Sequence, residues 1–389
     1  MTSSRLLSSL SQNRTRNSGQ IDNSLFPDHG GDWSSALALS QLPEKELIDF
    51  SVSLNPLGPP DIADKLIAQI INGLERYPEP TSEKLKECFA KFKNIPKASI
   101  VVGNGSNELI HTIPRLLPQG KKCVIVEPTF SEYDSAIRSA NIPITQYLLK
   151  PENNFKEDIE AFLFYLQGIE NLGSIILGHP NSPTGHIWEM DSLFSVKKFC
   201  ERKNILLIID EAFVDFCDKK VSFIQEAHRS KNLIVVQSLT KLFSIPGARL
   251  GFCILHPENA DRLNRFIPSW NVNSIAQTIG PEVLKDKQYL ERTQKYLSNT
   301  KKSFFSALNK IDAIKVFPSE TNFFLFKLIT GNSDISNLFF KHILAQGLIV
   351  RNCGNFPGLD HSFFRSAILS QEKNKKLIQT IELFFSPEQ

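Results

Sequence analysis

Short, continuous apolar runs alternate with longer segments of mixed polarity between residues 61 and 251 of this 389-residue chain. The runs lie at 98–102, 123–126, 174–177, 205–209, 233–236 and 250–255. A strand that is buried on both faces of a sheet has no polar face, so continuous apolar runs of this length are typical of parallel sheets. The mixed segments between them predict helices on both faces. The pattern therefore predicts an α/β fold with a mostly parallel sheet.

The C-terminal third of the chain has a different pattern. A helical stretch rich in charged residues is predicted over about 281–310. It is followed by apolar runs that predict a smaller α/β unit, at 313–317, 322–326, 348–351 and 364–368. A chain of this length can hold two domains. We expect a flexible or disordered N-terminal extension (1–26), followed by an N-terminal arm (27–60). A large domain (61–275) and a small C-terminal domain with its linking helix (276–389) come after them.

The composition changes this picture little but excludes several classes of protein. Hydrophobic residues make up 41% of the chain and charged residues 22%, as in ordinary globular proteins. The net charge of +3 is too small to indicate nucleic acid or a membrane surface as a partner. No run approaches the roughly 18 apolar residues that a membrane span needs. The six cysteines form no C-x-x-C pair and have no His cluster nearby, so we expect the reduced thiols of a cytoplasmic protein and no metal site.

The first twenty residues are rich in Ser and Asn, contain three Arg, and precede the first acidic residue, Asp22. This composition resembles that of an organelle transit peptide. It is equally typical of a disordered extension, which is the interpretation that we favour.

Two residues with distinctive chemistry directly follow apolar runs. Lys241 lies in Ser-Leu-Thr-Lys after the run at 233–236, and Asp210 follows the run at 205–209. Ligands of open α/β sheets bind at this carboxyl edge of the strands. A lysine there can form an imine with an aldehyde cofactor, and a carboxylate can keep a pyridine nitrogen protonated. Taken alone, Lys241 could be a structural or surface residue, and Asp210 could cap the next helix.

A glycine-rich turn follows the run at 98–102 and reads Gly-Asn-Gly-Ser-Asn-Glu over 103–108. Backbone N–H groups at the start of a helix bind phosphate, and side chains there can add further donors. The candidate donors at this turn and near Lys241 are Gly105, Ser106, Asn107, Ser238 and Arg249. A plain helix cap would explain the turn equally well.

Taken together and in order, these motifs resemble those of fold-type-I pyridoxal-phosphate enzymes. The set comprises Asn-Pro-Leu-Gly at 55–58, Arg-Tyr-Pro at 76–78, Gly-Asn-Gly at 103–105, Pro-Asn-Ser-Pro-Thr-Gly at 180–185, Asp-Glu-Ala at 210–212, Ser-x-x-Lys at 238–241 and Gly-x-Arg-Leu-Gly at 247–251. The resemblance implies an imine between Lys241 and the cofactor, with Asp210 on the pyridine nitrogen and Phe130 stacked on the ring. It also implies an obligate homodimer in which Tyr77 reaches the cofactor phosphate of the partner subunit.

Within that superfamily the chain resembles the threonine-phosphate decarboxylases of cobamide biosynthesis. The segments that support this lie at 29–31, 49–51, 210–216, 270–273 and 351–356. Histidinol-phosphate aminotransferases share the general layout, but they usually have Tyr where this chain has Phe213, and they lack the His-Gly-Gly opening. Phe213 cannot donate a hydrogen bond to the cofactor's phenolic oxygen, which should shift the proton affinity of the imine.

The resemblance also indicates which residues bind the substrate. Arg365 occupies the position that binds the α-carboxylate, and Arg351 would help to hold a phosphorylated amino acid. His29 and Gly30 match the opening that contacts the substrate phosphate. The alternative for either arginine is a surface ion pair, which is worth under about 1 kcal/mol.

Two positions depart from the family pattern, because Ser53 and Ser182 stand where relatives usually have Asn. A serine is shorter and offers one hydroxyl in place of a rigid amide. We therefore expect a retuned pocket in which O-phosphoserine competes with or replaces O-phosphothreonine.

On this basis we predict a carbon–carbon lyase that depends on pyridoxal phosphate. It would decarboxylate O-phospho-L-threonine to 1-amino-2-propanol phosphate, or O-phospho-L-serine to ethanolamine phosphate. The product would serve to make the cobamide nucleotide loop. A histidinol-phosphate-type aminotransferase is the alternative. A transcriptional regulator on the same scaffold is disfavoured, because the 26 residues before the recognisable architecture show no helix-turn-helix pattern.

Overall fold

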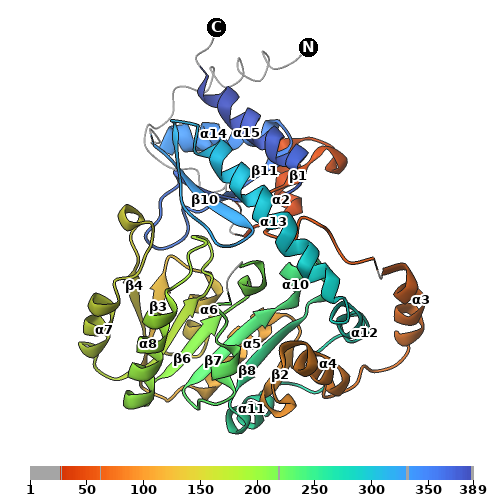
Figure 1. Ribbon diagram of the computed structural model, residues 1–389, viewed down its shortest axis with the longest axis vertical. Helices are drawn as coiled ribbons and strands as arrows, with labels where there is room; N and C mark the ends of the chain where they lie inside the picture. Colours follow the sequence, from red (N-terminus) through yellow and green to blue (C-terminus); the bar gives the residue numbers. More distant parts are fainter. Residues whose placement is uncertain (1–26, 28, 62, 218–219, 330–332, 387–389) are drawn as a thin grey trace.

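The computed structural model describes residues 27, 29–61, 63–217, 220–329 and 333–386. The predicted N-terminal extension over 1–26 lies outside these residues. The described chain forms a large lobe built on a wide sheet and a smaller lobe above it, and a long helix, α13 (Lys287–Leu308), runs between the two (Figure 1).

The large lobe contains a seven-stranded sheet whose strand order is β2-β8-β7-β6-β5-β3-β4. Its strands are β2 (Ile100–Gly103), β3 (Lys122–Glu127), β4 (Ile144–Leu148), β5 (Leu172–Gly178), β6 (Leu206–Asp210), β7 (Leu233–Ser238) and β8 (Gly251–Leu255). Strands β4, β3, β5, β6 and β7 pair in parallel, and β8 is antiparallel to both of its neighbours. The predicted mostly parallel α/β sheet is thus confirmed.

Both faces of this sheet are buried, which explains why its strands read as continuous apolar runs. Within β3, Val124 and Val126 belong to one hydrophobic cluster, and Cys123 and Ile125 belong to the other. The helices of the large lobe include α3 (Ala63–Gly73), α4 (Glu83–Lys93), α5 (Ser106–Thr112), α6 (Glu132–Ser139), α7 (Ile159–Gln167), α8 (Met190–Lys203), α9 (Ile224–Ala227) and α11 (Pro257–Asn264). The seventh strand, β4, was not predicted. It lies at the sheet edge and is only partly buried, so it lacks a continuous apolar run.

The small lobe contains a four-stranded antiparallel sheet in the order β12-β13-β10-β9. These strands are β9 (Ile314–Val316), β10 (Phe323–Leu328), β12 (Arg351–Asn352) and β13 (Phe363–Ala367), and they pack with α13, α14 (Ser333–Ala345) and α15 (Gln371–Phe385). The N-terminal arm joins this lobe. Its strand β1 (Ile48–Asp49) pairs in parallel with β11 (Leu348–Ile349), and its helix α2 (Trp33–Ser40) packs against α14.

The predicted continuous helical stretch over 281–310 is wrong in one respect, because the structure divides it. Helix α12 (Ser274–Val283) ends before residue 284, and α13 begins at Lys287. Asp286 caps α13 by accepting a hydrogen bond from the backbone N–H of Tyr289 at 2.9 Å. An N-cap aspartate inside a periodic pattern is a signal that a new helix starts there. Helix α12 packs against α3 and α4, whereas α13 packs against α15. The domain boundaries given above stay a prediction.

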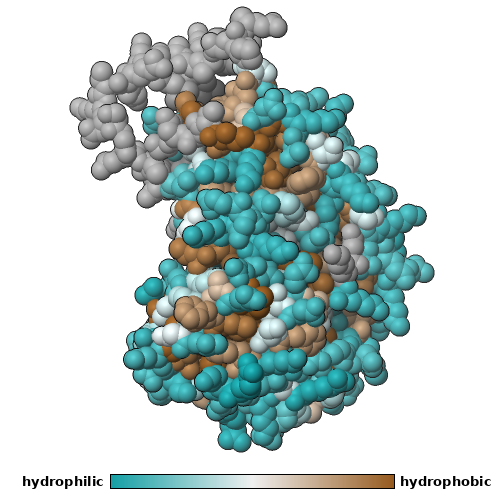
Figure 2. Space-filling model, turned by 60° about the vertical axis from the view of Figure 1, so that its left-hand side comes forward, coloured by the Kyte–Doolittle hydropathy of each residue, from teal (hydrophilic) through white to brown (hydrophobic). Residues whose placement is uncertain are grey.

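The surface face shown in Figure 2 is largely hydrophilic, with smaller hydrophobic patches between the polar areas. Across the described ranges, none of the helices combines the length and the apolar character that crossing a membrane requires.

Candidate active site

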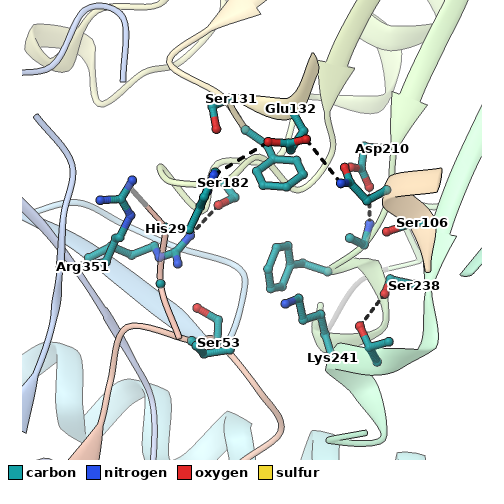
Figure 3. Close-up of a pocket in the computed structure, with 18 of the residues that line it drawn as sticks. His29, Ser53, Ser106, Ser131, Glu132, Ser182, Asp210, Ser238, Lys241 and Arg351 are labelled. Carbon is teal, nitrogen blue, oxygen red and sulfur yellow. Dashed lines mark hydrogen bonds and ion pairs between the residues drawn. The ribbon is translucent and has the colours of Figure 1, made fainter. Parts of the chain in front are cut away.

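A cavity of about 340 Å³ lies where the carboxyl ends of the parallel strands face the small lobe (Figure 3). The structure brings together at this cavity most of the predicted site residues: His29, Gly30, Ser53, Ser106, Asn107, Phe130, Ser182, Asp210, Ser238, Lys241, Arg249, Arg351 and Arg365. Gly105 directly precedes Ser106 on the cavity wall. Tyr77 does not line the cavity of its own chain.

Lys241 lies on α10 (Leu239–Leu242), a single helical turn directly after β7. Burial, together with the guanidinium groups of Arg365 and Arg249, lowers the pKa of Lys241 to about 8, against the opposing effect of Asp210. An amine with this pKa has a much larger neutral, nucleophilic fraction near neutral pH than an ordinary lysine, and it is mostly neutral above about pH 8. The surface interpretation of Lys241 therefore does not hold.

Asp210 ends β6 and lies deep in the cavity, with 6% of its surface exposed. Its Oδ2 accepts a hydrogen bond from the hydroxyl of Tyr133 at 2.8 Å, and its Oδ1 accepts one from the backbone N–H of Ala212 at 2.9 Å. Burial raises the pKa of Asp210, and these donors and Lys241 only partly oppose the shift. A buried carboxylate held in this way is a suitable partner for a protonated ring nitrogen.

Three groups form an anion site on the large-lobe side. The hydroxyls of Ser106 and Ser238 line the cavity with the guanidinium of Arg249. A Cβ atom on Gly105, whose φ is +90°, would lie 2.5 Å from Nη2 of Arg249. Only glycine permits this close approach of the guanidinium to the turn. The site can thus hold a phosphate group by charge-assisted hydrogen bonds.

Arg365 and Arg351 approach from the small lobe, where they stand directly opposite each other on β13 and β12. Arg365 donates from Nη1 to Oγ of Ser182 at 2.7 Å and from Nη2 to the carbonyl of Ser51 at 2.8 Å. Its Nε is buried and has no partner in the described part of the chain. Its guanidinium also lies over the ring of Phe323, 5.2 Å from the centroid. Burial lowers the pKa of Arg365 to about 10, so the group remains a cation at neutral pH.

Arg351 is buried and held by several contacts. It donates to the carbonyls of Pro27 and Asn352 and, at 2.7 Å, to Oδ1 of Asn355, and it lies over the ring of Phe356. Like charges placed directly opposite on a sheet repel each other. Two cations side by side, with Arg351 buried and Arg365 partly buried, therefore indicate a site suited to anions, and a surface ion pair does not describe either arginine.

His29 comes from the N-terminal arm, and its Nε2 lies 3.8 Å from Oε1 of Glu132 on α6 (Figure 3). Glu132 also accepts hydrogen bonds from His111 at 2.8 Å and Asn107 at 3.3 Å. Burial alone would raise the pKa of Glu132, but these hydrogen bonds outweigh it and the pKa is lowered. The carboxylate thus connects the arm to helix α5, which carries both Asn107 and His111.

Ser53 is almost fully buried at 2% exposure, lines the cavity, and has no hydrogen-bond partner for Oγ in the described residues. A buried hydroxyl without a partner costs free energy unless a ligand or water satisfies it. Tyr77, in contrast, is 82% exposed, and its ring lies 5.2 Å from that of Trp270. A contact of Tyr77 with a partner subunit stays a prediction.

Sequence reasoning missed Glu132, Tyr133 and Thr240, all of which line the cavity. Glu132 and Tyr133 follow the predicted ring-stacking residue Phe130 within one helical turn, and this was the signal that could have found them. Thr240 accepts or donates a hydrogen bond at 2.7 Å with Ser238.

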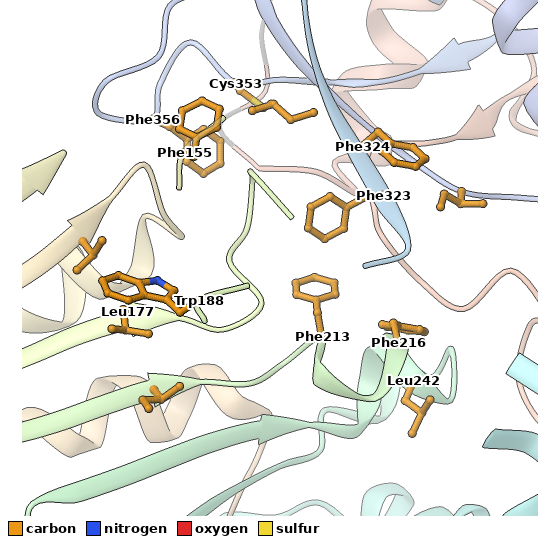
Figure 4. Close-up of a cluster of buried hydrophobic side chains, with 14 of the residues drawn as sticks. Phe155, Leu177, Trp188, Phe213, Phe216, Leu242, Phe323, Phe324, Cys353 and Phe356 are labelled. Atoms are coloured by element: carbon orange, nitrogen blue, oxygen red, sulfur yellow. The ribbon is translucent and has the colours of Figure 1, made fainter. Parts of the chain in front are cut away.

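Phe213 also lines the cavity. Its ring packs edge-on against Phe323 of the small lobe at 5.1 Å, within an apolar cluster that joins the two lobes (Figure 4). The side chain at this position therefore contributes packing and no hydrogen bond.

Comparisons with known proteins agree with this geometry. The chain matches the model of a family described as aminotransferase class I and II over residues 45–381. It is 33% identical over 361 residues to the adenosylcobalamin biosynthesis bifunctional protein CobDQ of Leptospira interrogans, a match that covers 92% of this chain and 41% of that protein. The chain thus spans less than half the length of that relative.

Two further relatives match over most of both chains. The threonine-phosphate decarboxylase of Salmonella typhimurium is 30% identical, with 91% of this chain and 95% of that protein covered. The crystal structure of the histidinol-phosphate aminotransferase from Clostridium acetobutylicum has a TM-score of 0.80 at 30% identity, with 86% and 98% covered. The chain therefore belongs to the aminotransferase class I and II family, whose cofactor is pyridoxal 5'-phosphate.

Proposed function

We propose that this enzyme decarboxylates an O-phosphorylated amino acid, O-phospho-L-threonine or O-phospho-L-serine, and releases the corresponding amino-alcohol phosphate. The likeness to the decarboxylase of Salmonella typhimurium and to a bifunctional protein of adenosylcobalamin biosynthesis supports this reaction and a place in making the cobamide nucleotide loop. An aminotransferase acting on a phosphorylated substrate is the second candidate, and the structural likeness to a histidinol-phosphate aminotransferase favours it.

The observation that carries the proposal is the distribution of cations around Lys241. Arg249 lies at the anion site of the large lobe, whereas Arg351 and Arg365 lie together on the small lobe with His29 nearby. A cofactor phosphate accounts for Arg249 alone. A substrate that carries both a carboxylate and a phosphate accounts for the cations on the other side.

The described residues fit pyridoxal phosphate. Lys241 would bind its aldehyde covalently, Asp210 would face its pyridine nitrogen, and Arg249 with the two serine hydroxyls would hold its phosphate. Tyr77 would add a contact from the partner subunit of a homodimer. When bound, the cofactor supplies an electron sink for the electron pair left at the substrate Cα.

The protein's own residues then decide which bond to Cα breaks. Arg365 would hold the α-carboxylate, and Arg351, with His29, would hold the phosphate at the other end of the substrate. Fixing both ends sets the orientation of the Cα–carboxylate bond, which selects loss of CO₂ over loss of the α-proton. Nζ of Lys241, with a pKa of about 8, can hold a proton near neutral pH and deliver it to Cα.

The pKa of Lys241 predicts how covalent attachment of the cofactor depends on pH. Only the neutral amine attacks an aldehyde, and the lowered pKa means that Nζ becomes neutral as the pH rises through about 8. In cofactor-free protein the rate of attachment should therefore rise with a midpoint near pH 8, measured by stopped-flow absorbance. A midpoint near 10.5, the ordinary value for lysine, would contradict the burial and charge environment described above.

One assay separates the two candidate reactions. The purified enzyme is incubated with O-phosphothreonine or O-phosphoserine without any keto acid, and CO₂ release is measured. A decarboxylase releases CO₂ under these conditions. An aminotransferase releases none and consumes substrate only when 2-oxoglutarate is added, which would refute the proposed reaction.

The unpartnered hydroxyl of Ser53 leads to a prediction about substrate choice. We expect kcat/KM for O-phosphoserine to equal or exceed that for O-phosphothreonine, because two short serines stand where relatives have Asn. Ser53→Asn restores the amide that relatives usually have, so it should shift the ratio toward O-phosphothreonine, by about tenfold, the order of discrimination that one methyl group gives. Ser139→Asn on the exposed part of α6 is the matched control. A strong O-phosphothreonine preference in the unmodified enzyme would refute the retuned pocket.

A further inference from the structure

The segment Trp270 to Asn273 does not line the cavity, yet its side chains bind the loops that do. It precedes α12 and lies against two loops of the large lobe: the glycine-rich turn at 103–108, and the turn at 246–249 that carries Arg249. The functional roles proposed above assign nothing to this segment.

Asn273 connects the two loops with one amide group. Its Nδ2 donates to Oδ1 of Asn104 at 2.7 Å and to the carbonyl of Ala248 at 3.0 Å. Asn104 is two residues before Ser106, and Ala248 directly precedes Arg249. The two sides of the anion site are therefore joined through this amide. Its Oδ1 accepts from the backbone N–H of Ala276 at 2.8 Å and caps α12.

Asn271 fixes the same turn from a second point. Its Nδ2 donates to Oε2 of Glu108 at 2.8 Å and to the carbonyl of Val102 at 3.2 Å. The same carboxylate oxygen accepts from the backbone N–H of Asn104 at 2.6 Å. The Glu108 carboxylate thus accepts two hydrogen bonds, and the one from the backbone N–H of Asn104 joins the two ends of the glycine-rich turn.

The anion site needs such support because its geometry is demanding. Arg249 has a φ of +56°, a left-handed conformation that a residue with a side chain adopts only when its surroundings enforce it. Its guanidinium must also lie against Gly105, where a Cβ would come within 2.5 Å. A small shift of either loop would change the distance between Arg249 and Ser106, which line the same cavity.

We propose that Asn273, together with Asn271, is a positioning residue for the cofactor phosphate: its amide sets the distance between the turn that carries Ser106 and the turn that carries Arg249. This inference rests on the proposed location of the cofactor phosphate, but it does not depend on which reaction the enzyme catalyses. This role explains why a segment outside the cavity donates four side-chain hydrogen bonds to residues in and beside the loops of the anion site.

The variant that tests it is Asn273→Ser. Serine is a good N-cap residue, so the cap of α12 is preserved, but its short hydroxyl cannot replace both amide hydrogen bonds. Cofactor-free protein is titrated with pyridoxal phosphate and, separately, with pyridoxal, which lacks the phosphate, and binding is followed by absorbance. We expect the dissociation constant for pyridoxal phosphate to rise at least tenfold, while that for pyridoxal stays within threefold of the unmodified protein.

The controls separate positioning from general damage. Asn259→Ser on α11 removes the amide that donates to the carbonyl of Lys231 and accepts from Arg262, neither of which belongs to the two loops, and it should leave both dissociation constants unchanged. An equal loss for both ligands in Asn273→Ser would show a merely structural role and overturn the inference. Unchanged binding of pyridoxal phosphate would overturn it as well. If the unmodified protein did not prefer pyridoxal phosphate over pyridoxal, the proposed location of the phosphate would itself be wrong.

Discussion

Lys241→Ala is expected to abolish both turnover and the absorbance of covalently bound cofactor. Lys241 lines the cavity and has a lowered pKa, and among the described residues that line this cavity there is no second lysine to replace it as a nucleophile toward an aldehyde. The loss should approach the limit of detection, because covalent attachment and proton delivery to Cα would depend on the same nitrogen.

The fold should survive this change, since it removes a cation from the neighbourhood of Arg365 and Arg249. With both proteins free of cofactor, Lys241→Ala should therefore show an unfolding temperature at or above that of the unmodified protein. Lys241→Arg is a second variant that keeps the charge, and it should be equally inactive because a guanidinium does not form the covalent bond. Lys203→Ala, at the exposed end of α8, should behave as the unmodified enzyme. Borohydride treatment that still fixes the cofactor to Lys241→Ala would refute the assignment.

The large sheet could be predicted from the sequence because its central strands are buried on both faces and therefore read as apolar runs. The edge strand β4 could not, since its exposed residues interrupt the run. Lys241 and Asp210 could be predicted to lie at one cavity for a related reason: each directly follows such a run, and parallel strands bring their carboxyl ends to one edge.

The small-lobe side of the site was less accessible to prediction. Arg351 and Arg365 were expected to act together, but nothing in their spacing along the chain fixes a strand register, and register places them directly opposite each other. Asn271 and Asn273 donate four side-chain hydrogen bonds to residues in and beside the loops of the anion site. Three of them, to Val102, Asn104 and Glu108, join residues more than 150 positions apart. Such contacts follow from tertiary packing and have no local signal.

Arg365→Ala should cost roughly 2–5 kcal/mol in transition-state stabilisation, which is about 30-fold to about 4,000-fold in kcat/KM. The guanidinium is already oriented by Ser182, by the carbonyl of Ser51 and by the ring of Phe323, and its Nε has no protein partner in the described residues. A side chain held this rigidly loses little entropy when it binds a carboxylate, so most of its charge-assisted hydrogen bonding contributes to binding.

The loss should appear with O-phosphorylated amino acids and spare the cofactor, because Arg365 stands on the small lobe away from the anion site at Arg249. The dissociation constant for pyridoxal phosphate in Arg365→Ala should thus remain within about threefold of the original value, which a collapsed pocket would not allow. Arg138→Ala, which removes an exposed ion pair with Asp134 on α6, is the matched control and should change kcat/KM less than twofold. A loss below about tenfold in Arg365→Ala would mean that another group holds the carboxylate. Arg351, its neighbour across the sheet, would then be the next arginine to replace.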